Sequence, residues 1–428
     1  MRILIYSYNY SPEPIGIAPL MTELAEGLVK RGHKVRVVTA MPWYPHMSIP
    51  PEYRGKLYKT EVCNGVLVQR CYVHCSQKRN FVNRAFFELS FMVLSFFQAL
   101  MGWRPNIILL TVPGLPVGLP ASILGWVYRC PVVLNLQDIL PDAAVQVRLL
   151  TNPRLIKVFE WFEQLNYRTA SKISVIAEGF IDNLVQKDVP LEKIELIPNW
   201  VDIDFIKPDT SEDNYFRKKY HLENKFIVLY SGNIALTQGI ENVVRAAVYL
   251  RNLPEIAIVI VGEPGKLADL ESFRQELGAD NVYLVPFQPR EKLPEMLAAA
   301  DVGLVMQKSN VIGFNMPSKI QVLLASGCAI IGSVPSTGTA AHAIADSGGG
   351  VVTPPEDPYN LSKAIQQLYE DPERLLHLGE KGRQYAVEHY DFVKALDRYE
   401  LLFVNLRRQL VQKKSIFYLE SEHQRQEY

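Results

Sequence analysis

Lys319 is the residue whose surroundings first suggest chemistry, because it is the single charged side chain in residues 313–331. Pro317 and Ser318 stand directly before it, at the start of a predicted helix over residues 320–326. An ammonium beside the free N–H groups of a helix start is suited to bind an anion such as a phosphate. The alternative is a surface lysine whose stem covers apolar residues while its charge stays in water.

Two carboxylates lie four residues apart in "NLQDILPDAA", where Asp138 directly follows a predicted buried strand. A carboxylate at that position must find a partner or face a ligand. Asp142 follows a proline, which is typical of a helix N-cap. We therefore expect Asp138 to take part in the chemistry and Asp142 to have a structural role.

Two glycine-containing loops also follow predicted strands. In "SYNYSPEPIGIAP" Gly16 precedes a predicted helix and lets the backbone approach a ligand, although an ordinary strand-to-helix turn explains the pattern equally well. In "YSGNIALTQG" Gly232 and Gly239 enclose Asn233 and Gln238. Glycines in such a loop allow a phosphate or a sugar to contact the backbone.

Two further strand ends complete the same predicted rim. Glu263 lies in "VGEPG", which lacks the full G-x-G-x-x-G pattern of a dinucleotide site, and Phe287 lies in "PFQPREKLPEML". The sequence contains no P-loop, no HExxH and no G-x-S-x-G. Kinase, metalloprotease and serine-hydrolase functions therefore lack support.

The elements that position these residues alternate between apolar, β-branched runs and segments of helical periodicity. Strand-like runs such as "RILIYSY", "KVRVVTA" and "PVVLNL" fill the first half, and "FIVLYSG", "IAIVIVG" and "DVGLVM" fill the second. The alternation stops at residues 198–214, which are rich in Pro, Asp and Asn and read as a hinge. The pattern predicts two doubly wound domains of parallel strands covered by helices, with ligands bound at the carboxyl ends of the strands.

Composition limits the function classes further. The 428 residues suffice for two domains, and 45 basic residues balance 45 acidic ones, so no overall charge draws the chain to nucleic acid. The five cysteines do not suggest a disulfide framework, and the first residues read as a strand and not as a secretory leader. Cys71 and Cys75 flank His74, but no second ligand cluster accompanies them, so we read them as half-buried thiols. We expect a protein of the cytoplasm.

Seven motifs in register make the sequence resemble the retaining nucleotide-sugar glycosyltransferases of family 4, closest to the colanic-acid-type exopolysaccharide branch. The resemblance covers Met1 to about Tyr399. It rests on "YSPEPIGIAPLMTELAEGLVKRGHKVRVVTAMPWYP", "LNLQDILPDAAV", "LIPNWVDID", "YSGNIALTQGIENVVRAA", "AADVGLV", "MPSKIQVLLASGCAII" and "STGTAAHAIADSGGGVV".

The resemblance implies an α/β fold of the GT-B type, in which two Rossmann-like domains face a cleft. Residues 1–200 would bind the acceptor, residues 201–385 would bind the nucleotide sugar, and residues 386–428 would form a helix that returns to the first domain, followed by a charged tail. It also implies transfer of a hexose-type sugar to a glycan or lipid-linked acceptor, with retention, without a metal or a cofactor. The donor would be a UDP- or GDP-sugar.

The same resemblance implies roles for individual residues. Asp138 would orient the reacting groups, and Lys319 would stabilise the negative charge on the departing diphosphate. The expected donor contacts are Gly16, Gly232, Asn233, Gln238, Gly239, Glu263, Phe287, Pro317 and Ser318.

The sequence departs from the wider family at two places. Asn233 and Gln238 stand where many members carry an arginine and a lysine, and Phe314 and Val322 stand where paired glutamates usually hold the donor. Lys319 would then carry more of the phosphate binding, with Arg245 and Arg290 as the next candidates.

Two other functions stay open at this point. A nucleotide-sugar epimerase of the same architecture would interconvert sugars without an acceptor. A non-catalytic binding protein would bind the nucleotide sugar without transferring it, which the missing glutamates suggest.

Residues 83–104 are almost entirely apolar or small and are nearly long enough to span a bilayer. Spanning would place strands of one sheet on opposite sides of the membrane. We therefore expect a helix that either docks on the inner face of the cell membrane or packs against the core. The basic residues that suit lipid headgroups are Lys78, Arg79, Arg84 and Arg104, and Phe91 and Phe96 are the expected docking side chains.

Overall fold

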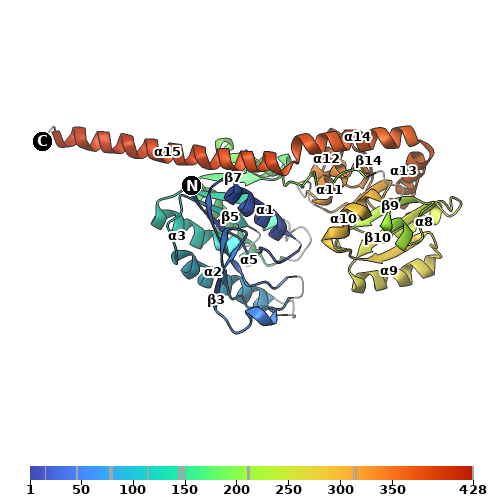
Figure 1. The fold of residues 1–428 in the computed structure, drawn as a ribbon, viewed down its shortest axis with the longest axis horizontal. Coiled ribbons are helices and arrows are strands. Elements are labelled where there is room, and N and C mark those ends of the chain that lie inside the picture. Colours follow the sequence, from blue (N-terminus) through green and yellow to red (C-terminus); the bar gives the residue numbers. More distant parts are fainter. Residues whose placement is uncertain are drawn as a thin grey trace. The chain divides into compact units, whose positions relative to one another are not determined.

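The computed structural model describes residues 1–14, 16–44, 47–76, 81–112, 115–142, 145, 150–209, 213–311, 313 and 316–426. Lys78, Arg79 and Phe314, for which the sequence raised expectations, lie outside these ranges. The chain divides into two compact units, both drawn in Figure 1. Unit 1 comprises Met1–Ile176, Phe180–Ile197 and Ala395–Tyr428, and unit 2 comprises Ala177–Gly179 and Pro198–Lys394.

Unit 1 is built on an eight-stranded sheet with the order β3-β4-β2-β1-β5-β6-β7-β8. Its strands are β1 (Arg2–Tyr6), β2 (Lys34–Ala40), β3 (Tyr58–Cys63), β4 (Val66–Cys71), β5 (Ile107–Val112), β6 (Val132–Leu136), β7 (Lys172–Val175) and β8 (Ile194–Leu196). Its helices are α1 (Ile17–Lys30), α2 (Phe81–Leu100), α3 (Gly118–Tyr128), α5 (Pro153–Thr169) and the greater parts of α6 (Glu178–Gln186) and α15 (Phe392–Gln426).

All pairs in this sheet are parallel except β3 with β4, which is antiparallel, so the prediction of an all-parallel first domain was wrong at this edge. Asn64 and Gly65 join the two strands, both with positive φ (49° and 82°), as a two-residue hairpin turn requires. The rest follows the predicted pattern. Asn152, for example, caps α5 by accepting a hydrogen bond from the Arg154 N–H at 2.9 Å, with Pro153 in the first turn.

Helix α2 buries one face and exposes the other. Phe87 and Phe91 pack against the ring of Tyr8, with centroids 5.6 and 4.2 Å away. The opposite face presents a stripe of exposed apolar side chains at helical spacing, Val82, Phe86, Leu89, Val93, Phe97 and Leu100. Phe91 is fully buried and belongs to the core, so its expected place on a docking face was wrong. No helix in the described part of the chain has the length and hydrophobicity to cross a bilayer.

Helix α15 is the last element of the described chain, and from Ala395 onward it belongs to unit 1. The Tyr399 hydroxyl accepts a hydrogen bond from Asn135 of β6 at 2.8 Å, and Glu400 accepts from Arg31 and pairs with His33, both at 2.7 Å. In Figure 1 this helix, drawn in red, runs over β7 and past the chain's N-terminus. The last helix is therefore an integral part of the first domain.

Unit 2 is built on a six-stranded parallel sheet with the order β11-β10-β9-β12-β13-β14. Its strands are β9 (Phe226–Ser231), β10 (Ile256–Gly262), β11 (Val282–Pro286), β12 (Val302–Met306), β13 (Ala329–Ser333) and β14 (Gly350–Thr353). Its helices are α7 (Tyr215–Lys219), α8 (Glu241–Tyr249), α9 (Pro264–Leu277), α10 (Leu293–Ala298), α11 (Lys319–Ala325), α12 (Thr339–Asp346), α13 (Pro358–Glu370) and α14 (Pro372–His389).

The core of unit 2 lies on both faces of this sheet. Ile227 and Leu229 of β9 pack into one cluster with α10, α11 and α12, whereas Val228 and Tyr230 pack into a second cluster with α8 and α13. Successive strand residues thus enter opposite layers, which is why the strands read as continuous apolar runs. Both units are doubly wound α/β sheets, which confirms the predicted fold class.

Candidate functional site

The strand order of unit 2 identifies where a ligand should bind within that unit. From β9 the chain crosses to β10 on one side, while β12 pairs with β9 on the other side and leads away to β13. Helices that follow neighbouring strands in opposite directions leave a crevice at the carboxyl ends of those strands. The loop after β9, residues 232–239, and the loop after β12 border this position.

Lys319 lies against the start of the loop after β9. Its Nζ is 3.8 Å from the centroid of the Tyr230 ring and 3.3 Å from the point where a Cβ on Gly232 would lie. This nitrogen is buried and has no hydrogen-bond partner in the described part of the chain. Burial lowers the pKa of the Lys319 ammonium to about 7. The site therefore holds a cation without a counter-charge, beside a glycine whose φ of 143° places bare backbone next to it.

The two polar residues of this loop are engaged in folding it. The Tyr230 hydroxyl lies within hydrogen-bond distance of two acceptors, the backbone carbonyl of Asn233 at 2.8 Å and the side-chain oxygen of Gln238. Gly239 ends the loop with a φ of 59°, which glycine adopts without strain. The loop is thus shaped around the Tyr230 hydroxyl, and the side-chain amide nitrogens of Asn233 and Gln238 are left as potential ligand donors, whereas the backbone N–H of Gln238 donates to the Ala235 carbonyl at 3.1 Å.

Pro317 and Ser318 precede α11 as expected, but the helix is shorter and less strongly capped than a phosphate-binding helix. The Pro317 carbonyl accepts from the N–H of Ile320 at 3.1 Å, and the Ser318 side chain makes no capping bond. With only seven residues in α11, its end contributes little field. The start of α11 therefore adds little to anion binding, and the ammonium of Lys319 itself is the group that could bind an anion.

Glu263 and Phe287 lie at the carboxyl ends of β10 and β11. The Phe287 N–H donates to the Gly262 carbonyl at 3.1 Å, which places the two strand ends side by side. Both side chains are exposed, with 49% of Phe287 accessible, as a ring that stacks on a base would be. Ile234 of the loop after β9 packs against Gly262, where a Cβ would come within 2.5 Å of it. The loop after β9 and these two residues therefore share one edge of unit 2.

Asp138 belongs to unit 1 and follows β6, as predicted. Its side chain is exposed, and it makes no hydrogen bond or ion pair within the described residues. Burial raises its pKa to about 6, which is the effect of crowding by neighbouring protein around a carboxylate that water still reaches. Asp142 pairs instead with Lys187 and Asn183, at 3.0 and 3.1 Å, so its role is structural. The N-cap hydrogen bond that the sequence suggested is not among its contacts with the described residues.

Gly16 also belongs to unit 1 and forms the N-cap of α1 with a φ of 70°. A Cβ there would meet nothing within 4 Å, so the glycine is required by its conformation and leaves open space before the helix. The loop that leads to it, residues 7–16, is fixed by two buried charges that the sequence analysis missed, Arg70 and Glu13.

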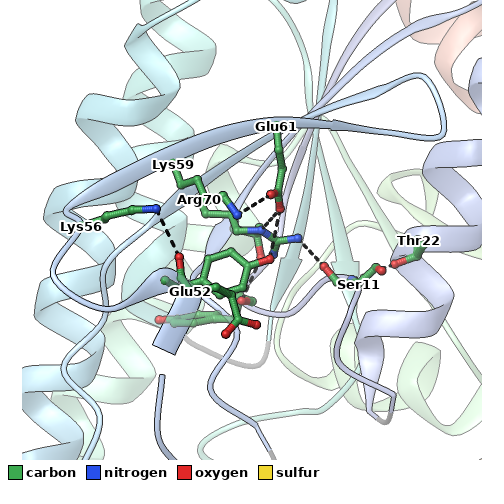
Figure 2. Close-up of polar contacts among 10 residues, drawn as sticks. Ser11, Thr22, Glu52, Lys56, Lys59, Glu61 and Arg70 are labelled. Carbon is green, nitrogen blue, oxygen red and sulfur yellow. Dashed lines mark hydrogen bonds and ion pairs between the residues drawn. The ribbon is translucent and has the colours of Figure 1, made fainter. Parts of the chain in front are cut away.

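Figure 2 shows the first of these charges. Arg70 of β4 donates to the Ser11 carbonyl and to Glu61, both at 2.5 Å, and the Ser11 N–H donates to Thr22 of α1 at 3.0 Å. Lys59 approaches the other oxygen of Glu61 at 2.9 Å. Arg70 thus ties the loop to the edge strands. An arginine inside the strand-like run "VLVQRCYV" was the signal that could have revealed it.

The second buried charge, Glu13, accepts hydrogen bonds from the N–H groups of Trp43 and Tyr44, both at 2.9 Å. Asn9 donates to its other oxygen at 2.6 Å. Glu13 therefore joins the loop after β1 to the loop after β2. Both loops lie at the carboxyl edge of the unit 1 sheet, where ligands of such sheets bind.

Other candidates are engaged elsewhere. Arg245 stacks over the Phe273 ring at 4.9 Å and Arg290 over the Phe205 ring at 5.9 Å. Val322 packs against the unit 2 core. Among the residues that the structure describes, no cluster of three or more His, Cys, Asp or Glu side chains could hold a metal ion.

Comparisons with known proteins agree with this architecture. The family "Glycosyl transferases group 1" matches residues 211–385, and the family "Glycosyl transferase 4-like domain" matches residues 16–200. WcaI of Escherichia coli K12, which is assigned to colanic acid biosynthesis as a glycosyl transferase, is 34% identical over 334 residues, 76% of this chain and 82% of WcaI. A GDP-mannose-dependent phosphatidylinositol monomannoside mannosyltransferase of Mycolicibacterium smegmatis is 28% identical over 206 residues, 47% of this chain and 54% of that protein.

Among solved structures, Anabaena HepE in complex with UDP has a TM-score of 0.67 at 16% identity, with 97% of this chain and 100% of that chain covered. HepE has also been solved with UDP-glucose. At this identity the likeness concerns the fold, which is GT-B. From the two family matches and the similarity to WcaI, the chain belongs to the group 1 glycosyltransferases.

Proposed function

We propose that the protein is a retaining, metal-independent glycosyltransferase that moves a hexose-type sugar from a nucleoside diphosphate sugar to a glycan or lipid-linked acceptor in cell-surface polysaccharide synthesis. The similarity to WcaI supports the polysaccharide role. The observation that carries the proposal is the buried Lys319 Nζ against Gly232, which has no hydrogen-bond partner among the described residues and lies at the carboxyl edge of a doubly wound sheet.

This arrangement suits departure of a diphosphate. As the bond between the anomeric carbon and the donor phosphate breaks, the bonding electrons pass to the phosphate oxygen, and negative charge grows on the leaving group. A fixed cation in a buried site stabilises that charge more than it stabilises the ground state. Lys319 would supply the cation, and the backbone beside Gly232 would let the diphosphate approach closely.

Retention needs no nucleophile from the protein in this scheme. The acceptor hydroxyl attacks the anomeric carbon from the face that the diphosphate leaves, and its proton passes to the departing phosphate oxygen. Asp138 would orient the acceptor hydroxyl or the transferred sugar through its exposed carboxylate. The donor is a UDP- or GDP-sugar, because HepE binds UDP and UDP-glucose and the mycobacterial relative depends on GDP-mannose.

An enzyme with a lipid-linked acceptor benefits from binding to the membrane that holds the lipid. The exposed face of α2 is suited to such binding. The apolar stripe on α2 is exposed along the whole helix. Trp126 of α3 and Trp161 of α5, from helices in the same layer, are 81% and 57% exposed. Arg84 and Arg104 are exposed at the two ends of the stripe. Apolar and tryptophan side chains with basic residues at their borders favour an anionic lipid surface.

The function is tested by incubating the purified protein with a panel of UDP- and GDP-sugars, first for a rise in melting temperature and then for transfer. A ligand at a hundred times its dissociation constant stabilises by about 2.7 kcal/mol. Transfer to an added acceptor with the anomeric configuration kept supports the proposal. Sugar interconversion without acceptor would identify an epimerase, and nucleotide binding without hydrolysis or transfer would identify a binding protein.

A further inference from the structure

The loop after β9 is bordered by a second lysine, which the sequence analysis did not single out. Residues 232–240, "GNIALTQGI", contain no charged side chain. The first end of this loop contacts Lys319 at Gly232, and the other end contacts Lys308 at Gly239. A loop without charge of its own thus has a cation from a different element at each end.

Lys308 contacts the loop after β9 through a backbone hydrogen bond and through the aliphatic carbons of its side chain. Its N–H donates to the Thr237 carbonyl at 2.8 Å. Its Cγ and Cε lie 3.3 and 3.4 Å from the point where a Cβ on Gly239 would be. A side chain at position 239 would therefore push Lys308 away, in addition to straining the positive φ of that residue. The aliphatic stem is positioned by contacts of the loop itself.

The contact between Lys308 and the loop after β9 lies where the strand order of the sheet predicts a ligand. Lys308 follows β12, and the loop follows β9, and these are the neighbouring strands between which the sheet reverses its order. A ligand of a doubly wound sheet binds at this reversal. The buried Nζ of Lys319, for which the described residues offer no hydrogen-bond partner, borders the same loop and independently indicates an anionic ligand.

The charge of Lys308 already acts on a neighbouring acid. Hydrogen bonds from Ser309 lower the pKa of Glu356, and the charge of Lys308 adds to this effect. Glu356 accepts its hydrogen bonds from the N–H and hydroxyl of Ser309, so its carboxylate has partners other than the lysine. The Lys308 ammonium is therefore within electrostatic reach of this edge of unit 2.

We propose that Lys308 is the second phosphate-binding cation of the site, so that Lys319 and Lys308 bind the two phosphate groups of a nucleoside diphosphate from opposite ends of the loop after β9. This deepens the proposed function and rests on it. Two separated cations favour a ligand with two linked phosphates over a nucleoside monophosphate, which reaches one of them. Lys308 is thus a residue that determines specificity for the diphosphate.

The test compares Lys308→Met with Lys225→Met by calorimetric titration with UDP, GDP, UMP and GMP. Lys225 is a matched control because it precedes β9 at the opposite edge of the sheet, where its Nζ donates to the Pro254 carbonyl at 2.7 Å. A charged hydrogen bond to phosphate corresponds to roughly ten- to a hundred-and-fifty-fold in binding. We expect Lys308→Met to lose at least about tenfold in diphosphate affinity and clearly less in monophosphate affinity, and Lys225→Met to bind as wild type.

Lys308→Arg keeps the charge and should recover most of the diphosphate affinity, which separates a charge effect from a disturbed loop. If wild type binds UDP or GDP and Lys308→Met binds within threefold of it, the assignment of Lys308 is overturned while the proposed function stands. Equal losses of monophosphate and diphosphate affinity would also overturn it. If wild type binds no nucleoside diphosphate, the proposed function and this inference fall together.

Discussion

Nucleotide-sugar binding should depend on pH through Lys319. Without ligand, burial beside Tyr230 and Gly232 lowers the pKa of this lysine to about 7, because it gains no counter-charge in return. A bound diphosphate supplies that charge and raises the pKa again. Binding therefore takes up a proton wherever the unliganded lysine is neutral, and affinity must fall as the pH rises above 7.

The size of the effect follows from the same shift. At pH 9, two units above a pKa of about 7, only about 1% of unliganded molecules carry the proton. Each further pH unit then lowers affinity by up to about tenfold. The loss of affinity cannot exceed the free energy of the charged hydrogen bond to phosphate, about 1.5 to 3 kcal/mol, which corresponds to roughly ten- to a hundred-and-fifty-fold. We expect affinity to fall at least about tenfold between pH 6 and pH 9.

Isothermal titration at pH 6, 7, 8 and 9 measures this directly. An intact sugar nucleotide is a better probe than a free diphosphate, because it lacks the second phosphate ionisation near pH 6. Repeating the pH 8 titration in buffers of different ionisation enthalpy should show uptake of roughly 0.4 to 0.9 proton for each ligand bound, because a ten- to a hundred-and-fifty-fold effect places the pKa of the bound lysine about one to two units above that of the free one. Lys319→Met should bind weakly at every pH and take up no proton. Wild-type affinity that is constant from pH 6 to 9, or a pH dependence that Lys319→Met retains, would refute the reasoning.

Three other predictions concern stability, turnover and membranes. Lys319→Met should raise the melting temperature, most below pH 7 and least near pH 10.5. The reason is that folding lowers the lysine pKa from 10.5 to about 7, so the stability of the wild type rises with pH between these two values. An unchanged melting temperature at pH 6 would contradict this. Asp138→Asn should lower turnover at least about tenfold at unchanged melting temperature. Wild-type turnover should also fall below pH 6, as the Asp138 carboxylate protonates. Full activity of the variant, or a glycosyl adduct on Asp138, would disprove the orienting role of this carboxylate. Phe86→Asp with Phe97→Asp should abolish flotation with anionic vesicles, whereas Leu376→Asp, at a still more exposed apolar position on α14, should float as wild type. If the double variant still floats, α2 is not the docking face.

The strands were predictable because parallel strands buried on both faces must be continuously apolar. The predicted strand-like run "KVRVVTA", for example, is β2 (Lys34–Ala40). The hairpin of β3 and β4 was missed because β3 carries polar residues in alternation and resembles a loop. The Asn64–Gly65 pair was the available signal, since both residues adopt the positive φ that such a turn needs.

The site was predictable only in part. Lys319 and Gly232 stood out individually, as a lone charge and as a glycine after a strand, but nothing in the sequence shows that the Lys319 Nζ lies 3.3 Å from the point where a Cβ on Gly232 would be. Lys308 carries no local pattern, because a lysine in a polar loop cannot be distinguished from its neighbours until the strands beside it are known. Arg70 had a signal, a charge inside a strand-like run, but the sequence does not show which loop it contacts. Helix α2 stayed ambiguous because it is apolar on both faces, and burial alone separates Phe91 from Phe86.

Helix α15 gives the two units different histories during synthesis. Unit 2 is almost entirely one continuous stretch, Pro198–Lys394, and can fold as soon as that stretch has left the ribosome. Unit 1 is made first but lacks the partner of Asn135 and His33 until Tyr399 and Glu400 emerge. The two earlier parts of unit 1, Met1–Ile176 and Phe180–Ile197, therefore remain partly exposed until Ala395 and the residues after it have been translated. The domain that begins the chain is the last to be finished, so a ribosome that stops early releases an incomplete unit 1 whatever the state of unit 2.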